Sequence, residues 1–360
     1  DLFEDYEFEG GIRIPTTFNG AEYFVTFQNK KHRLDQTYAV YMRNTRFNDD
    51  SPTLVPRRRE YNILLGQYAV KYPLDVFRSI RATTTLRRDR MVQLATDRAT
   101  YNVPDQTSQR LGLRLEYVFD NTVDIAMNLR TGTRYRAFVE MQKKFSVGDE
   151  ANFDINFNKG FMTVLAADFR HYQRILRHSI LAGRFSAATS FGSERILYFL
   201  GGMDNWLFPQ QNNDIPVPSG NFAFQTLAAN LRGFPINIRN GSSFALVNTE
   251  LRIPLFRYFS RRIQSPLFKN FQVLGFFDIG TAWEGKTPYR DDNPLNTTKF
   301  PDGPFITTTV NYFRDPLVAG YGFGARTTLF GYFIRADYAW GIETQRIQKP
   351  KLYLSFGLDF

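Results

Sequence analysis

Apolar and polar residues alternate with a period of two along most of this chain. In the segment 109–119, every second residue is apolar: Leu111, Leu113, Leu115, Tyr117 and Phe119. The residues between them include Gly112, Arg114 and Glu116. Successive side chains of a strand point to opposite sides, so this pattern predicts a strand with one apolar and one polar face.

The chain ends on the same pattern, in "KLYLSFGLDF". One face of this predicted strand is apolar: Leu352, Leu354, Phe356, Leu358 and Phe360. The other face is mixed: Tyr353, Ser355, Gly357 and Asp359. Burial against a second sheet or contact with lipid would both suit the apolar face.

We expect sixteen strands and no helix, because no segment shows apolar residues at helical spacing. The expected strands are 6–16, 21–29, 36–46, 59–72, 77–88, 109–119, 133–145, 160–172, 178–191, 194–202, 221–231, 243–256, 270–284, 316–329, 331–342 and 351–360. An even number is typical of single-chain bacterial outer-membrane barrels. In such a barrel the last strand pairs with the first, because lipid offers no partner to backbone groups at an open edge.

The connections between these strands are long on one side and short on the other, as in outer-membrane barrels. With the first hairpin taken as extracellular, 89–108 and 285–315 are long extracellular loops. The segment 73–75 and the Phe330–Gly331 junction are short periplasmic turns. One connection does not fit, since 203–220 would be an unusually long periplasmic turn.

Composition favours a transmembrane barrel over a soluble β-sandwich, which is the alternative. Aromatic residues make up 16% of the chain, yet the mean hydropathy is −0.36, and the sequence has no apolar run long enough for a membrane-spanning helix. A barrel combines these properties because half of each strand faces lipid and half faces a polar lumen. The net charge of +10 is spread over alternating strands, which favours contact with the lumen or lipid headgroups over nucleic acid.

Several kinds of chemistry are excluded or lack a motif. The chain has no cysteine, so it has no disulfide, thiolate metal site or cysteine nucleophile. Its three histidines show no metal-ligand spacing, and we expect no metal, no cofactor and no enzymatic activity. The glycine-rich "GYGFGAR" at 320–326 alternates as a strand, so we interpret its glycines as small residues that face the lumen.

Three segments in the last part of the chain carry a more specific pattern. They are "LRGFPINIRNGSSFALVNTELRIPLF" (231–256), "FQVLGFFDIGTAWEG" (271–285) and "VAGYGFGARTTLFGYFIRADYAW" (318–340). From about residue 200 onward the chain resembles the barrel of the BamA-like superfamily of outer-membrane assembly factors and two-partner secretion transporters. In that family an Arg-Gly-Phe/Tyr motif lies in the sixth extracellular loop, which folds into the lumen, and five strands follow it. Arg232, Gly233 and Phe234 match the motif, and five expected strands follow them.

The resemblance implies a loop anchor and a lateral seam. The anchor would join the Arg232 guanidinium to acidic residues on the next two strands, which are Glu250 and Asp278 here. The terminal decapeptide would be the β-signal that assembly machinery reads, and the last strand would form a weak seam with the first. The residues concerned are Gly10, Gly11, Tyr353, Phe356, Gly357, Leu358 and Phe360. The glycines would weaken the seam or, alternatively, only accommodate curvature.

The resemblance also implies a function and partners. We expect residues 1–360 to form one barrel in the outer membrane of a Gram-negative bacterium, without the family's N-terminal periplasmic domains, and to insert or translocate other proteins. Expected partners are outer-membrane lipids and lipopolysaccharide, unfolded outer-membrane proteins, and periplasmic or lipoprotein accessory proteins. The alternatives are a two-partner secretion pore, a hub that organises surface proteins, and a diffusion porin. The opening residues lack the features of a signal peptide, so we expect that a signal has been removed or that a longer polypeptide precedes them.

Overall fold

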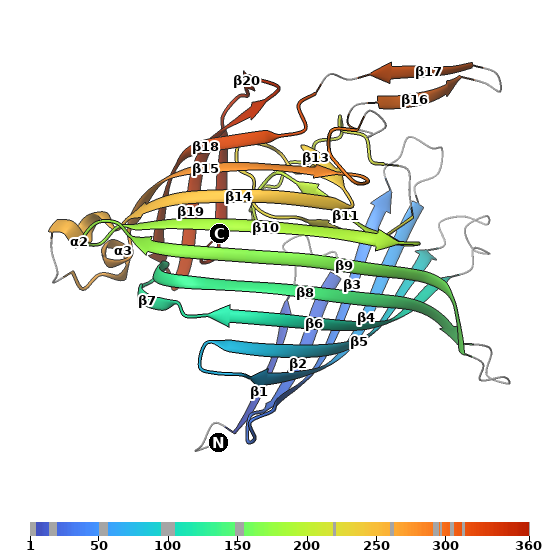
Figure 1. Ribbon diagram of the computed structural model, residues 1–360, viewed down its shortest axis with the longest axis horizontal. Helices are drawn as coiled ribbons and strands as arrows, with labels where there is room; N and C mark the ends of the chain where they lie inside the picture. Colours follow the sequence, from blue (N-terminus) through green and yellow to red (C-terminus); the bar gives the residue numbers. More distant parts are fainter. Residues whose placement is uncertain are drawn as a thin grey trace. The chain divides into compact units, whose positions relative to one another are not determined.

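The computed structural model describes residues 5–13, 20–49, 57–94, 105–147, 155–218, 221–259, 263–290, 295, 297–302, 306–311 and 314–359. Nearly all regular structure in these residues is β-strand (Figure 1). Chain contacts divide the protein into two compact units, Asp1–Val118 with Phe138–Thr163 (unit 1) and Phe119–Ala137 with Val164–Phe360 (unit 2). No helix among the described residues has the length and apolar character needed to cross a membrane.

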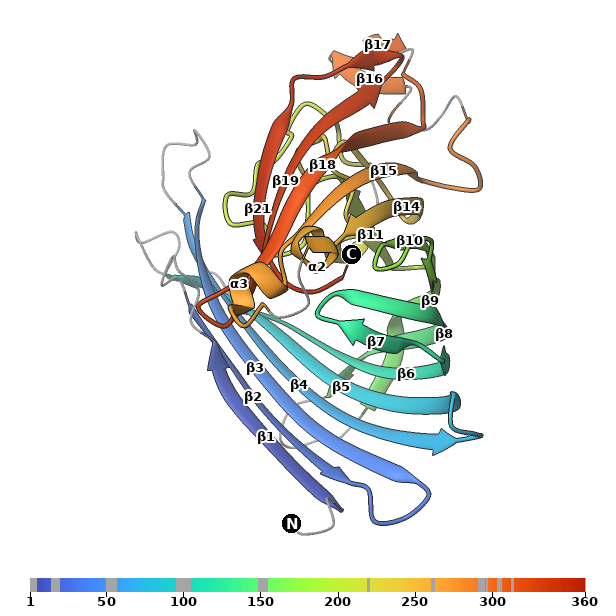
Figure 2. The same cartoon turned by 90° about the vertical axis from the view of Figure 1, so that its left-hand side faces the viewer.

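Unit 1 is built from long consecutive hairpins, which lie side by side in Figure 2. Its strands are β1 (Tyr6–Arg13), β2 (Gly20–Asn29), β3 (Asp35–Asp49), β4 (Arg57–Pro73), β5 (Arg78–Leu94) and most of β6 (Gln106–Asp120). Strands β8 (Leu129–Val147) and β9 (Ile155–Arg174) contribute residues to both units. One face of β2–β4 carries a row of rings, in which the Phe27 and Tyr68 centroids lie 6.3 and 5.0 Å from that of Tyr38. Such a row suits a face that contacts lipid.

Unit 2 contains the counterparts of the five strands that the sequence predicts after the Arg-Gly-Phe motif. They are β14 (Ser243–Ile253), β15 (Gln272–Trp283), β18 (Val318–Leu329), β19 (Tyr332–Glu343) and β21 (Lys351–Phe356). Each pairs antiparallel with the next, and β14 also pairs with β10 (Ile180–Gly192). Phe330 and Gly331 form the two-residue turn between β18 and β19, both with positive φ, as a tight hairpin requires.

Of the strands that the structure describes, sixteen belong to one sheet, so the predicted all-β antiparallel barrel class is confirmed. The predicted membership was wrong at two places. Segments 194–202 and 221–231 form β11 (Arg195–Leu200) and β12 (Phe222–Leu227), which pair with β13 (Arg239–Gly241) in a separate small sheet. The β11–β12 pair is parallel, so these strands cannot be consecutive members of an antiparallel barrel. The short strands β7 (Val123–Ala126) and β20 (Arg346–Ile347) bring the large sheet to sixteen.

The pairing of β10 with β14 also explains the segment 203–220, which was too long for the periplasmic turn that the sequence predicted. Because β10 pairs directly with β14, everything between Gly192 and Ser243 is one connection, on the side of the long loops. The segment 203–220 is therefore part of this loop and is not a periplasmic turn.

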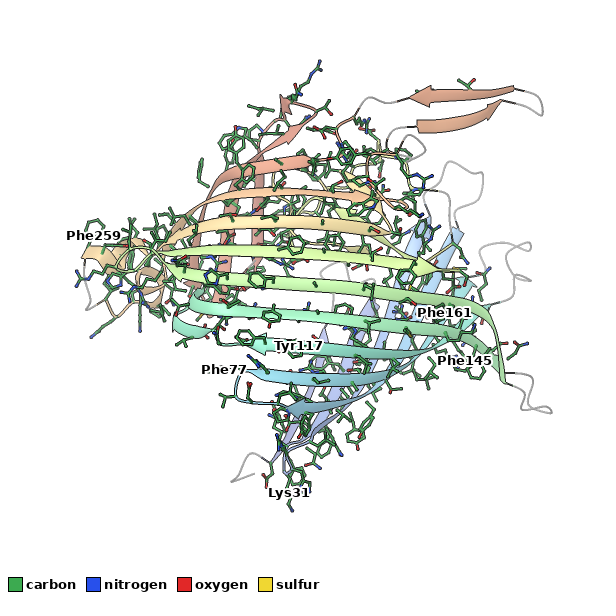
Figure 3. The ribbon with its side chains drawn as sticks, in the orientation of Figure 1. Lys31, Phe77, Tyr117, Phe145, Phe161 and Phe259 are labelled. Carbon is green, nitrogen blue, oxygen red and sulfur yellow. The ribbon has the colours of Figure 1, made fainter. Side chains whose placement is uncertain are left out.

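Three further features differ from the sequence prediction. Two short helices, α2 (Leu255–Phe259) and α3 (Pro266–Lys269), join β14 to β15, and Phe259 at the end of α2 is 80% exposed (Figure 3). Strands β16 (Thr297–Asp302) and β17 (Ile306–Asn311) form a hairpin within the predicted loop 285–315. The last strand, expected to reach the chain end, stops at Phe356, and Gly357 turns the chain with φ +135°.

Candidate functional site: an anchored loop inside unit 2

Arg232 lies between β12 and β13, in the long connection, and is only 2% exposed. Its Nε and Nη2 donate to the two oxygens of Asp278 at 2.7 and 2.8 Å. Its Nη1 donates to Glu250 Oε1 at 2.7 Å and to Asp337 Oδ2 at 3.4 Å. The structure thus brings Arg232 together with the two acidic residues that the resemblance implied, in the bidentate geometry that a guanidinium fork favours.

The three carboxylates are buried on the inner faces of β14, β15 and β19. Glu250 also accepts from Arg326 at 2.6 Å and pairs with Arg252 at 2.7 Å. Burial lowers the pKa of Arg232, but Asp278 and Glu250 raise it by more, so that the pKa lies well above its ordinary value. Arg232 therefore stays charged, and its pairs compensate for burial only while all partners remain in place.

The backbone at Gly233 lies directly on the sheet. Gly233 has φ +98°, and a Cβ there would lie 2.6 Å from the Gly341 nitrogen of β19. A Cβ at Gly320 of β18 would lie 1.8 Å from the carbonyl oxygen of Arg232. Gly320 and Gly341 are cross-strand partners, so together with Gly233 they form a contact surface that only glycines allow.

Tyr353 of β21 fixes the same turn from the last strand. Its hydroxyl accepts from the Gly233 N–H at 2.9 Å and donates to the Phe234 carbonyl at 2.8 Å. Tyr353 was predicted as a seam residue, but its side chain is fully buried and binds the motif. The loop is therefore held by groups on β14, β15, β18, β19 and β21.

Phe234 supplies the apolar part of the anchor. It is 1% exposed and packs in a buried cluster that includes Leu200, Leu231, Ile238 and Phe244. Most of these residues belong to the long connection itself, so the loop carries its own core and does not rely on the ion pairs alone. Burial of several large apolar side chains is enough to keep such a loop folded.

The end of the chain enters a second buried polar cluster. Asp359 is 5% exposed and pairs with Arg252 at 3.0 Å, Arg170 at 2.7 Å and Arg134 at 2.8 Å. Its backbone N–H donates to Asn128 Oδ1 at 2.7 Å. The C-terminal segment after Gly357 thus leaves the strand direction and is fixed among arginines inside unit 2.

The long connection also covers one edge of β21. The Leu207 N–H donates to the Leu354 carbonyl at 2.9 Å, and Asn205 Nδ2 donates to the Phe356 carbonyl at 3.1 Å. Because β19 pairs with the other edge, Asn205–Leu207 takes the position of a neighbouring strand at the end of the sheet path. In Figure 2 the yellow-green connection that contains this segment runs beside β21. The Trp206 ring lies tilted against that of Tyr353, with ring centroids 4.7 Å apart, and links this contact to the anchor.

The remaining predicted seam residues lie in separate parts of the protein. Gly10 and Gly11 pair with Val25 and Phe24 in unit 1. In unit 2, Phe356 and Leu358 are 38% and 49% exposed, as the alternation predicted. Phe360 lies outside the described residues. A pairing of β1 with β21 stays a prediction.

Sequence reasoning missed four residues of this site: Tyr353 as an anchor, Asp337, Gly320 and Gly341. A signal was present for the glycines, because a strand with small residues on its inner face leaves space for another chain segment. For Asp337, the signal was an inward carboxylate in mid-strand without an assigned partner.

Comparison with known proteins supports the fold. No family model matches the chain, and no curated protein matches it in sequence. Among solved structures, it is similar to BamA from Haemophilus ducreyi lacking POTRA domains 1-3, with TM-score 0.54 and 13% identity over 94% of this chain. It is also similar to CdiB from Acinetobacter baumannii, with TM-score 0.51 and 11% identity over 94% of this chain. The chain covers 62% and 49% of those two proteins.

These likenesses and the strand pairing define the class of protein. The chain is an antiparallel transmembrane β-barrel with an inward-folded loop. More particularly, it has the BamA-like barrel fold.

Proposed function

We propose that this barrel lies in the outer membrane of a Gram-negative bacterium and inserts other polypeptides into it without catalysing a chemical reaction. The observation that carries the proposal is the edge of β21. The carbonyls of Leu354 and Phe356 point away from β19, and among the described residues their donors come from a short loop segment, Asn205–Leu207. A strand edge held in this way can exchange one partner for another by β-augmentation.

The anchored loop supports this function by shaping the barrel near that edge. Arg232 and Gly233 are fixed to four strands of the sheet, and Tyr353 connects them to β21 itself. Release of Asn205–Leu207 would then expose backbone groups of β21 while the rest of the loop stays in place. Unfolded outer-membrane proteins are the partners that this mechanism requires, and periplasmic accessory proteins would deliver them.

A polypeptide secretion pore is the second candidate, because the likeness to CdiB is nearly as strong as the likeness to BamA. In that case the Arg232–Phe234 part of the long connection would leave the lumen and a client would pass through it, while Asn205–Leu207 would stay on β21. The edge of β21 would then keep its loop partner throughout.

Depletion of the chain from its own bacterium distinguishes the two. We expect the amounts of several unrelated outer-membrane barrels to fall together, because each needs a template edge to insert. The measurement is quantitative proteomics of isolated outer membranes. Loss of one secreted polypeptide from the cell surface, with barrel proteins unchanged, would instead support the pore.

A further inference from the structure

A groove opens on the face of β2–β5 that carries the row of aromatic rings, entirely within unit 1. Its cavity volume is about 580 Å³. Two rows of side chains that run across the four strands line it. The first row includes Asn44, Asn62 and Arg90, which the strand register places side by side.

The second row lies one step further along the same strands and is mainly apolar. Tyr23, Met42 and Leu64 are cross-strand neighbours, and Arg88 ends the row. The groove therefore combines polar groups at one side with apolar groups at the other. This arrangement fits a ligand that is itself amphiphilic.

The position of the groove matches a boundary of the membrane. Beyond the second row the same face is apolar, starting with the aligned Val25 and Val40, and becomes polar again at Gln36. Asn44 and Gln36 are eight residues apart on β3, a distance of roughly 26 Å at the rise of a strand. The apolar band of an outer-membrane barrel is about 25 Å high, so the groove lies where that band meets the headgroups.

The side of the membrane follows from the connections. The groove lies near the start of β2 and towards the ends of β3 and β5, on the side of the connection from β5 to β6. We take this side as extracellular, because the connection from β5 to β6 is longer than those from β2 to β3 and from β4 to β5, and outer-membrane barrels have their longer loops outside. The outer leaflet lies on that side.

The polar groups of the groove suit a phosphate and a hydroxyl. Arg88 is exposed, and no residue in the described part of the chain pairs with its guanidinium. Arg90, in contrast, donates to Asp105 at 2.9 Å. The side-chain carbonyl of Asn44 is buried without a donor among the described residues. An arginine fork binds phosphate oxygens, and an amide carbonyl accepts from a hydroxyl.

We infer that this groove binds the phosphorylated headgroup of an outer-leaflet lipid. Arg88 holds the phosphate, the Asn44 carbonyl accepts from a headgroup hydroxyl, and Tyr23 and Leu64 contact the first part of the acyl chains. The lipid is then a fixed part of the barrel surface at β2–β5. This inference does not depend on whether the barrel inserts or secretes polypeptides.

The test uses the full chain in phosphatidylcholine nanodiscs that contain a small fraction of lipid A. We expect the wild-type protein to retain lipid A through detergent extraction, as measured by native mass spectrometry. Arg88→Gln should lower the retained amount by about tenfold, because it removes a charge-assisted hydrogen bond to the phosphate. A tenfold change in affinity corresponds to about 1.4 kcal/mol, which is the size of one such bond. Arg81→Gln is the matched control, since Arg81 lies on β5 with the opposite parity and outside the groove.

Two results would overturn the inference. Equal lipid A retention by Arg88→Gln and Arg81→Gln would show that Arg88 holds no headgroup. Displacement of lipid A by inorganic phosphate at equal concentration would show a site for free phosphate and not for a lipid. The heat-modified mobility of each variant on electrophoresis establishes that it is folded before lipid is measured.

Discussion

Replacement of Arg232 by alanine should lower the free energy of unfolding by about 3–5 kcal/mol, the usual cost of removing one partner of a buried ion pair. The reason is that the carboxylates of Glu250 and Asp278 stay buried after the arginine is removed. Glu250 keeps Arg252 and Arg326, but Asp278 is fully buried, and the one side-chain donor that it keeps among the described residues is the Asn248 amide, at 2.8 Å. The measurement is urea unfolding of the barrel in lipid vesicles, followed by tryptophan fluorescence.

Two control variants distinguish loss of the Arg232–Asp278 ion pair from general destabilisation of the barrel. Arg195→Ala removes an arginine of the same loop whose partner is Glu284, but the two side chains are 29% and 16% exposed, so the loss should be smaller than for Arg232→Ala. The double variant Arg232→Ala/Asp278→Asn should be more stable than Arg232→Ala, since it removes the uncompensated charge. If the double variant were less stable by the full sum of both changes, the anchor would not depend on this pair.

Gly320→Val should detach the Arg-Gly-Phe turn from the sheet. A Cβ at this position would meet the Arg232 carbonyl oxygen at 1.8 Å, and the atoms involved are backbone, which cannot rotate away. Ala229→Cys provides the reporter, because Ala229 is 3% exposed in the loop core and the chain has no other cysteine. We expect maleimide to label this cysteine at least about tenfold faster in the Gly320→Val background, a factor that corresponds to a shift of about 1.4 kcal/mol.

Gly275→Val is the matched control for this clash. Gly275 lies on the neighbouring strand β15, and no atom lies within 4 Å of a Cβ placed there. Labelling of Ala229→Cys should therefore stay slow in that background. Equal labelling rates in the two backgrounds would mean that the glycine contact does not hold the loop.

Most of the barrel could be predicted from the sequence because its strands have one lipid-facing and one lumen-facing side. The period-two pattern located β18 and β19 to within about two residues, and it placed Asp278 on the inner face. The same alternation predicted which residues of the last strand face inward and which face outward. Tyr353 and Ser355 are fully buried, and Leu352 is 57% exposed. A one-residue error would have exchanged the two faces, so this signal is strong.

The pattern could not show which strands pair. Segments 194–202 and 221–231 have the length and alternation of barrel strands, yet they pair with each other in parallel inside the long connection. The length of the connections indicated the error, because a turn as long as 203–220 did not fit short periplasmic turns and long extracellular loops. Tertiary contacts such as the Tyr353 hydroxyl on Gly233 had no local signal, since 120 residues separate the partners.

The edge contact also changes how a seam should be probed. The alternation placed Ser355 on the inner face of the last strand. In the structure its hydroxyl is buried and accepts from Arg335 Nε at 3.0 Å, so a cysteine there would break a buried hydrogen bond. Leu207 and Leu354 are better positions. They face each other across the edge of β21, and Leu207 is 43% exposed. Directly opposed residues of an antiparallel pair lie within the Cα distance that a disulfide accepts.

The most direct measurement is therefore a disulfide lock between Leu207→Cys and Leu354→Cys, in cells that depend on the locked protein. We predict that oxidation, but not reduction, lowers the amounts of other outer-membrane barrels, because β21 cannot release its loop partner. A second lock, Tyr338→Cys with Leu352→Cys, joins strands that are already paired and should have no effect. Barrel levels that stay unchanged while the first lock forms completely would contradict the proposal that the edge of β21 acts on other proteins.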